Sequence, residues 1–435
     1  MPIVNSRVVA GMVKERYSLH EIRDIFEFLC QKGTFSFHSL PNGLFPAADL
    51  RVDAKYTGYG NVWVRDNIYV AFAHHVNCKT PVAVRNVKTL SRYFMKHKRR
   101  LEMIVSGERN YREPANRPHI RFDGENLSEI NQKWAHAEND ALGYFVWLFS
   151  RLHNEGCAVI TSEERELLAL FALYFNAIRY WEDEDSGHWE ETRKIESSSI
   201  GVVVGALEEF KILLEKDGIG RVNYREKEIS IDLLESLIGQ GRKSLQETLP
   251  AECSQDDPRK NRRYDAALLF LIFPMKVVTE QMADQILFDV THHLQGDYGI
   301  RRYIGDSFWS ADYKKKMKPE ERTIDVSDNI SVRDSLLKAG QEAQWCLFDP
   351  IISIIHGLKY QHYRTEENLR LQTYFFNRSL GQLTGEDGPF KALRCPELYY
   401  FEDGKYVPND TVPLLWTQAN LWMAFEFMEV SLRKK

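Results

Sequence analysis

The sequence predicts an all-α fold, and three observations point to that class. Apolar residues recur with the helical period of about 3.6 residues in about a dozen segments. Alternating strand patterns are few and short, and the clearest of them lie at 34–37, 220–224 and 397–401. No internal repeat of fixed period is present, which disfavours a solenoid and leaves a bundle or a closed ring of helical hairpins.

The segment 198–215 shows the helical pattern most clearly. Its apolar residues fall on one stripe, and charged residues lie outside that stripe. Serine hydroxyls at 197–199 offer N-cap oxygens, and Asp217 and Gly218 end the pattern. We expect further helices in the other segments with this periodicity, which are 20–32, 66–77, 83–105, 139–154, 163–180, 230–248, 264–278, 280–294, 340–358, 364–383 and 413–432.

Two connections, 110–132 and 301–333, are long for a compact helical domain. Both are rich in Arg, Asp, Asn, Tyr and Trp taken together. Loops of this length usually build a binding or catalytic site. No linker rich in Pro, Gly or Ser divides the chain, so we expect residues 1–435 to form a single domain.

The composition argues against several functional classes. The formal net charge of −5 and the lack of a basic domain argue against a general nucleic-acid-binding protein. The six cysteines are scattered without a CxxC pair, which argues against a zinc site and a disulfide framework, so we expect no metal or other cofactor. The N-terminus lacks the apolar core of a secretory signal, and no stretch is apolar enough to cross a bilayer. We therefore expect a soluble cytoplasmic protein without a membrane partner, whose oligomeric state the sequence does not reveal.

Two short segments each place an acidic residue beside aromatic residues. Glu190 follows Trp189, and Glu397 stands two residues before a pair of tyrosines. Such surroundings desolvate a carboxyl and raise its pKa. A pair of carboxyls with pKa values set apart is the machinery of glycoside hydrolysis. Taken alone, the acidic loop 181–191 is more often solvated than catalytic, and it is no calcium loop because Arg193 stands where a glutamate should close it.

The loop 58–67 combines aromatic and polar residues in the way that sugar binding requires. Tyr59 and Trp63 offer flat faces, Arg65 offers a fork of donors, and Asp66 offers acceptors. Sugars stack on aromatic faces and need paired donors and acceptors for their hydroxyls. The alternative is that Asp66 is a helix N-cap with Arg65 as its salt-bridge partner, and that Trp63 belongs to the core.

Other motifs fail on inspection. The segment 239–244 resembles a phosphate-binding loop only in part, because Arg242 occupies the place of an obligatory glycine. The adjacent histidine pairs 74–75 and 292–293 point in different directions on a helix, so we expect neither pair to chelate a metal.

The chain resembles glycoside hydrolase family 15, the glucoamylase family. In motif detail it is even more similar to the glucoamylase-like domain of the phosphorylase kinase alpha and beta subunits. The segments that carry the resemblance are, in chain order, Trp63–Asn67, Trp134–Ala141, His188–Glu191, Tyr298–Tyr303 with Asp306, Pro396–Tyr400 and Val412–Trp416. The resemblance implies an (α/α)6 barrel of twelve helices, with long loops forming the active-site face.

The resemblance also implies roles for individual residues. Glu190 corresponds to the general acid and Glu397 to the general base. Tyr59 would face the developing oxocarbenium ion. The other residues that the resemblance assigns to substrate binding are Trp63, Arg65, Asp66, Asn139, Asp140, Trp189, Glu191, Arg302 and Trp416.

Three hypotheses remain open at the level of sequence. The first is an inverting, exo-acting α-glucoside hydrolase that releases glucose from the non-reducing end of an oligosaccharide or short α-glucan. The second is a non-catalytic carbohydrate-binding or regulatory protein, as the likeness to the kinase subunits suggests. The third is a helical scaffold whose tryptophans are only core, which leaves the clustering of Trp, Arg and paired Glu on loops unexplained. The sequence does not distinguish α-1,4, α-1,6 and α,α-1,1 linkages.

Overall fold

The structure, a computed structural model, describes residues 2–49 and 58–433 and is dominated by helices. Three small sheets of two or three strands accompany the helices within these residues. The predicted all-α class is therefore confirmed. In the described part of the chain, no helix is long and apolar enough to span a membrane.

Twelve helices of the described chain alternate between an inner and an outer ring. The inner helices are α3 (Val64–Val76), α6 (Asn139–Asn154), α8 (Ser197–Lys216), α10 (Leu269–Ile272), α14 (Phe348–Tyr363) and α16 (Leu415–Leu432). Each inner helix packs against the next, and α16 returns to α3 to close the ring. The outer helices, each packed against an inner one, are α2 (Leu19–Gln31), α4 (Thr80–Lys96), α7 (Ser162–Ile178), α9 (Ile231–Thr248), α11 (Glu280–Asp289) and α15 (Glu366–Gly381). This arrangement is the predicted (α/α)6 barrel.

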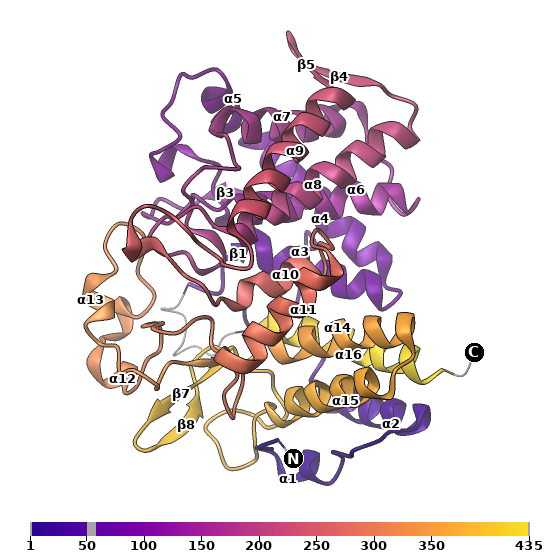
Figure 1. The fold of residues 1–435 in the computed structure, drawn as a ribbon, viewed down its shortest axis with the longest axis vertical. Coiled ribbons are helices and arrows are strands. Elements are labelled where there is room, and N and C mark those ends of the chain that lie inside the picture. The colour runs from indigo at the N-terminus through magenta and orange to yellow at the C-terminus, as the bar shows by residue number, and fades with distance from the viewer. Residues whose placement is uncertain (1, 50–57, 434–435) are drawn as a thin grey trace.

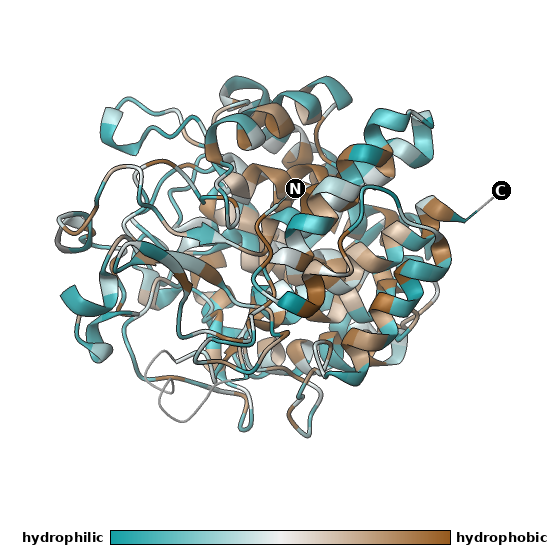
Figure 2. Ribbon diagram, turned by 90° about the horizontal axis from the view of Figure 1, so that it is seen from below, coloured by the Kyte–Doolittle hydropathy of each residue, from teal (hydrophilic) through white to brown (hydrophobic). Residues whose placement is uncertain are grey.

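The two rings differ in the way that their positions require. The inner helix α3 buries eleven of its thirteen residues, whereas the outer helix α2 buries only Ile22, Ile25 and Leu29 on one stripe. A helix that is apolar all round belongs inside a protein, and a striped helix belongs at its surface. Figure 2 shows the same contrast, with hydrophobic ribbon inside and hydrophilic ribbon outside. The buried apolar residues form one cluster from α2 to α16, which supports the proposal of a single domain.

The inner helices α6 and α8 pack especially closely, and a glycine permits this. A Cβ atom at Gly143 would lie 3.0 Å from Val202 Cγ1 and 3.3 Å from the α8 backbone. A side chain at this position would force the neighbouring α8 atoms to shift, because such contacts are tighter than ordinary packing. The close packing brings the N-terminal turns of both helices to one end of the barrel.

Several predicted elements differ from those observed. The segment 83–105 forms two helices, α4 and α5 (Arg99–Val105), and the segment 340–358 becomes helical only at Phe348. In 264–278, helix α10 is one turn long, because Pro274 disfavours helical backbone at the residue before it and Phe273 is extended. Residues 34–37 form no strand.

The other two predicted strands are present, as β4 (Arg221–Tyr224) and β7 (Leu398–Glu402). The remaining strands are β1 (Val62–Trp63), β2 (Arg121–Asp123), β3 (Ser128–Glu129), β5 (Lys227–Ser230), β6 (Gln344–Trp345) and β8 (Lys405–Pro408). The other helical turns are α1 (Arg7–Ala10), η2 (Pro114–Asn116), η3 (Gly187–Trp189), η4 (Pro258–Lys260), η5 (Ala266–Leu268), η6 (Val290–Leu294), η7 (Pro319–Glu321), α12 (Tyr313–Lys316) and α13 (Ser331–Asp334). In Figure 1, strands β3, β7 and β8 and helices α12 and α13 gather on the left of the ring. The two long connections supply β2, β3 and α12 to this face.

Candidate active site

A pocket of about 740 Å³, measured with the solvent at its mouth, lies where the inner helices begin. Among the described residues, nine of the twelve predicted site residues line this pocket: Tyr59, Trp63, Arg65, Asp66, Trp189, Glu190, Arg302, Glu397 and Trp416. The two predicted catalytic carboxyls therefore open into the same cavity, although they stand far apart in the sequence.

Strand β1 and helix α3 position the first group of these side chains. Trp63 ends β1 and is the N-cap residue of α3, so Arg65 and Asp66 lie in the first helical turn. Arg65 pairs with carboxyls of other segments, and Asp66 is not the N-cap residue. The alternative of Asp66 as an N-cap paired with Arg65 is therefore wrong, whereas Trp63 does belong to the buried core cluster as well as to the pocket lining.

A strained turn aims Glu190 into the pocket. Glu190 follows η3 with a φ of 58°, in the left-handed region. This conformation costs a residue with a side chain roughly 1–2 kcal/mol. Gly187 also has positive φ, and a Cβ atom there would overlap the Glu196 carboxylate. The packing around this glycine fixes the turn and with it the direction of Glu190.

The guanidinium of Arg65 connects Glu190 to two further carboxyls. Its Nη1 atom lies 3.4 Å from Glu190 Oε1, its Nη2 donates to Glu138 Oε2 at 2.8 Å, and its Nε donates to Asp140 Oδ2 at 2.6 Å. Burial raises the pKa of Glu190 to about 8, and the attraction of Arg65 opposes this only in part. Glu190 consequently keeps its proton at neutral pH.

Glu397 has different surroundings. It directly precedes β7, and the β7–β8 hairpin brings Asn409 back against it. The Tyr59 hydroxyl donates to Glu397 Oε1 at 2.7 Å, and Asn409 Nδ2 donates to Oε2. Burial raises the pKa of Glu397, while hydrogen bonds from Tyr59 and Asn409 favour the ionised form. Glu190 has the Arg65 guanidinium nearby, whereas Glu397 accepts hydrogen bonds from neutral donors.

Three predicted site residues lie behind the pocket lining. Asn139 Nδ2 donates to Asp183, which also pairs with Arg117, and Asp140 is engaged by Arg65. Glu191 accepts a hydrogen bond from the Tyr303 hydroxyl. It also forms ion pairs with three guanidiniums, those of Arg262, Arg302 and Arg333. Burial alone would raise the pKa of Glu191, but these arginines outweigh burial and hold it well below its ordinary range. Their polar atoms are occupied within the protein, so these residues orient the lining instead of forming it.

The described lining also contains residues to which the sequence assigned no role. They are Ala47, Trp134, His188, Phe308, Thr323–Val326, Arg333, Trp345 and Leu414. Trp134 stands in a segment that carries the family resemblance, so that segment was the available signal. Phe308, 323–326 and Arg333 belong to the long connection 301–333. Trp345 lies in the segment 340–358, whose apolar pattern predicted only a helix.

Four tryptophans of the lining share an unusual property. The indole Nε1 atoms of Trp63, Trp134, Trp345 and Trp416 have no hydrogen-bond partner within the described residues. A buried donor without a partner is unfavourable, and such groups are rare in proteins. By contrast, Trp189 Nε1 donates to Asp265 at 3.0 Å.

A family model described as "Glycosyl hydrolases family 15" matches residues 34–317. The chain belongs to this family. The matched residues include the turn that carries Glu190, whereas Glu397 lies beyond them. The family resemblance inferred from the sequence is therefore confirmed.

Solved structures similar to this family 15 chain share its fold. One titled "Glycosidase Wild Type" has a TM-score of 0.64 and 15% identity, covering 94% of this chain and 98% of that one. The glucoamylase from Saccharomycopsis fibuligera has a TM-score of 0.60 and 12% identity, covering 96% and 97%. At these identities, the likeness shows the fold alone.

A curated relative connects the chain to a regulatory protein. The "Probable phosphorylase b kinase regulatory subunit alpha" of Caenorhabditis elegans is 22% identical over 287 residues. The match covers 57% of this chain and 21% of that subunit, so the chain spans about a fifth of the relative's length.

Two groups of side chains in the described residues have the composition of a metal site, and neither lines the pocket. The buried group is Glu196, Glu252 and Cys253. Its Glu252 carboxylate already accepts the backbone N–H and hydroxyl of Ser198 in the first turn of α8. The other group is His75, Glu155 and Cys157, at the opposite end of α3 and α6.

Proposed function

We propose that this chain is an inverting, exo-acting α-glucoside hydrolase that releases glucose from the non-reducing end of short α-glucans. The observation that carries the proposal is the convergence of Glu190 and Glu397 on one pocket. Membership of family 15 supports the class of reaction. Its substrate would be an oligosaccharide or α-glucan.

The two carboxyls divide the chemistry between them. Glu190, with its pKa near 8, gives its proton to the glycosidic oxygen as the bond to the anomeric carbon breaks. Glu397 takes a proton from a water molecule whose oxygen attacks that carbon from the opposite face. Glu190 ends ionised and Glu397 ends protonated, and exchange with solvent restores both. Inversion requires the carboxyls to stand about 6.5–9.5 Å apart, which leaves room for the water.

The lining suits a sugar that enters end-on. The tryptophans of the lining offer flat faces on which a sugar ring can stack, and the Asp66 carboxylate is an acceptor. Arg302 lies 5.1 Å from the Trp189 ring centroid and is held by Asp306, so it presents a fixed edge to the ligand. Buried ion pairs of Arg65 and Glu191 lie behind this lining and hold it in place.

A second candidate is a carbohydrate-binding regulatory protein. The likeness to the kinase regulatory subunit favours it. Such a protein would keep the pocket and its tryptophans but would not turn substrate over. Hydrolysis therefore discriminates between the two functions.

A panel of α-glucosides tests the proposal. We expect the unmutated protein to release glucose from at least one of maltooligosaccharides, isomaltooligosaccharides and trehalose. Glu190→Gln and Glu397→Gln should each abolish release and leave binding largely intact. Glu184→Gln changes a partly exposed carboxyl of the same loop that pairs with Lys260, so it is the matched control and should retain activity. Sugar binding by the unmutated protein without any release from the panel would favour the regulatory function.

A further inference from the structure

His75, Glu155 and Cys157 converge at the end of the barrel opposite the pocket. His75 lies in the last turn of α3, Glu155 is the C-cap residue of α6, and Cys157 follows two residues later. Ten residues of helix separate His75 from Arg65, which corresponds to roughly 15 Å along the helix axis. The group is therefore distinct from the candidate active site.

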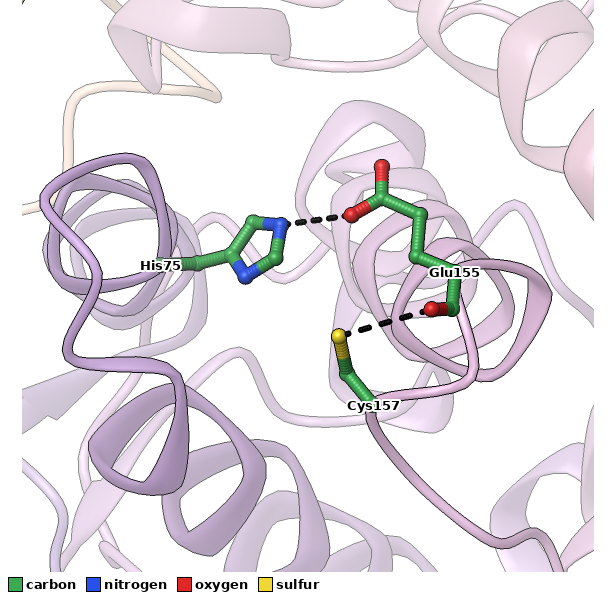
Figure 3. A group of neighbouring side chains, drawn as sticks. All are labelled: His75, Glu155 and Cys157. Carbon is green, nitrogen blue, oxygen red and sulfur yellow. Dashed lines mark hydrogen bonds and ion pairs between the residues drawn. The ribbon is translucent and has the colours of Figure 1, made fainter.

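The three side chains bring three different metal-ligand atoms together. His75 Nε2 lies 2.7 Å from Glu155 Oε2. An imidazole nitrogen of His75, a carboxylate oxygen of Glu155 and Cys157 Sγ all lie within 4.8 Å of one another. Figure 3 shows the imidazole and the carboxyl pointing toward each other from two helices, with the thiol beside them. Cys157 is exposed, so the group is open to an ion from solution.

The three facing atoms contact one another or the backbone: His75 Nε2 and Glu155 Oε2 form an ion pair at 2.7 Å, and the Cys157 thiol lies 3.7 Å from the Glu155 carbonyl oxygen. The other imidazole nitrogen, Nδ1, lies 3.1 Å from Thr80 Oγ1, and the other carboxylate oxygen of Glu155 accepts from Arg151 Nε at 2.8 Å. When Nδ1 carries its proton toward Thr80, Nε2 presents a lone pair to the carboxylate. A hydrogen bond from the second nitrogen that fixes the tautomer in this way is typical of metal-bound histidine. In that tautomer a bridging cation holds Nε2 and Oε2 together, whereas in the other tautomer Nε2–H donates to Glu155 directly.

We propose that His75, Glu155 and Cys157 form a divalent transition-metal site whose preferred ion is Zn²⁺. Imidazole nitrogen, carboxylate oxygen and thiolate sulfur are the ligands of zinc, with bonds of about 2.0–2.3 Å in a tetrahedron. Small shifts of these side chains satisfy such bonds, and water takes the fourth position. The Cys157 thiol gives up its proton to solvent as the metal–sulfur bond forms. The C-terminal ends of α3 and α6 add partial negative charge, which favours a cation.

The site would join two inner helices at one end. The opposite ends of the same helices carry Arg65 and Asp140, which pair with each other beside the pocket. A bound ion therefore stabilises the pair of helices on which the pocket is built. The sequence indicated no metal here because 82 positions separate His75 from Cys157 and no CxxC pair is present.

Cobalt and zinc binding test the site. The protein is stripped with a chelator and titrated with Co²⁺ and Zn²⁺. We expect about one ion per chain and a thiolate-to-cobalt charge-transfer band in the near ultraviolet. Cys157→Ser should abolish the band, and His75→Gln and Glu155→Gln should each weaken Zn²⁺ binding at least tenfold. Cys30→Ser, which removes an exposed thiol on α2, is the matched control and should change neither the cobalt band nor the affinity for Zn²⁺.

Alkylation of the unmutated protein provides a second measurement that needs no variant. Zn²⁺ should protect Cys157 from a thiol reagent and leave Cys30 reactive, as read by mass spectrometry. A cobalt complex without a thiolate band, a band that survives Cys157→Ser, or equal reactivity of Cys157 with and without Zn²⁺ would each overturn the proposal.

Discussion

The Tyr59 hydroxyl donates a hydrogen bond of 2.7 Å to the Glu397 carboxylate, which joins the loop before α3 to the residue that directly precedes β7. This contact favours the ionised form of Glu397 against the effect of burial. A general base must be ionised before it can accept a proton. The loop 58–67 and the segment 395–400 thus act on the same reacting water in the proposed mechanism.

Tyr59→Phe removes this donor and keeps the ring. Without the hydrogen bond the pKa of Glu397 rises, so the acid limb of the pH profile of kcat/KM should move to higher pH. The loss of one preorganised donor should also lower kcat by about 10²–10³-fold. A pH–rate profile of both proteins measures the two effects. An unmoved acid limb would contradict the role of Tyr59.

The raised pKa of Glu190 gives a second prediction, about stability. A carboxyl whose pKa is near 8 in the folded protein and near 4.5 in the unfolded chain is protonated preferentially in the folded state. The free energy of unfolding should therefore fall as pH rises from about 4.5 to 8. Glu190→Gln removes this dependence, so the variant should melt higher than the parent at pH 8 and about equally at pH 4. Thermal melts at both pH values test this, and a variant that is less stable at pH 8 would contradict the burial of a neutral Glu190.

The arginine cluster around Glu191 predicts a structural effect. Glu191→Gln leaves Arg262, Arg302 and Arg333 without a shared carboxylate and should destabilise the fold by about 3–5 kcal/mol. The stabilisation of the fold by ionised Glu191 is fully present above the pKa that this carboxyl has in the unfolded chain. It disappears as pH falls toward the lowered pKa of the folded protein. Glu184→Gln breaks only a partly exposed pair with Lys260 and should cost about 0–1 kcal/mol. Denaturant unfolding compares the two variants, and equal costs would contradict the importance of the cluster.

Trp345→Phe tests the tryptophans of the lining. The change replaces the indole with a smaller aromatic ring at a position that lines the pocket. The smaller stacking face, a loss of about 0.5–1.5 kcal/mol, should weaken oligosaccharide binding about 2- to 13-fold. Trp309→Phe, at a buried position outside the pocket lining, should leave binding unchanged. Calorimetric titration of both variants measures the difference.

Helix period and local composition were sufficient to predict most of the barrel. The inner helix α3 and the outer helix α2 were both found from their apolar patterns, although their environments differ. The length of helix α10 was overestimated, because the apolar periodicity of 264–278 continues past Pro274, where the backbone cannot remain helical.

The site was predictable where its residues lie in contiguous motifs. Glu190, Glu397 and Arg65 belong to such motifs and line the pocket, whereas Trp345 lies in the segment 340–358, whose apolar pattern predicted only a helix. The surroundings of Glu191 could not be predicted, because its arginine partners come from segments that only the fold brings together.

The anomer of the first sugar released tests the central claim most directly. If Glu190 and Glu397 act from opposite faces of one pocket, proton NMR during hydrolysis of an α-glucoside should show β-glucose first, followed by slow mutarotation. Initial release of α-glucose would contradict the inverting mechanism, because it requires a covalent intermediate on one of the carboxyls.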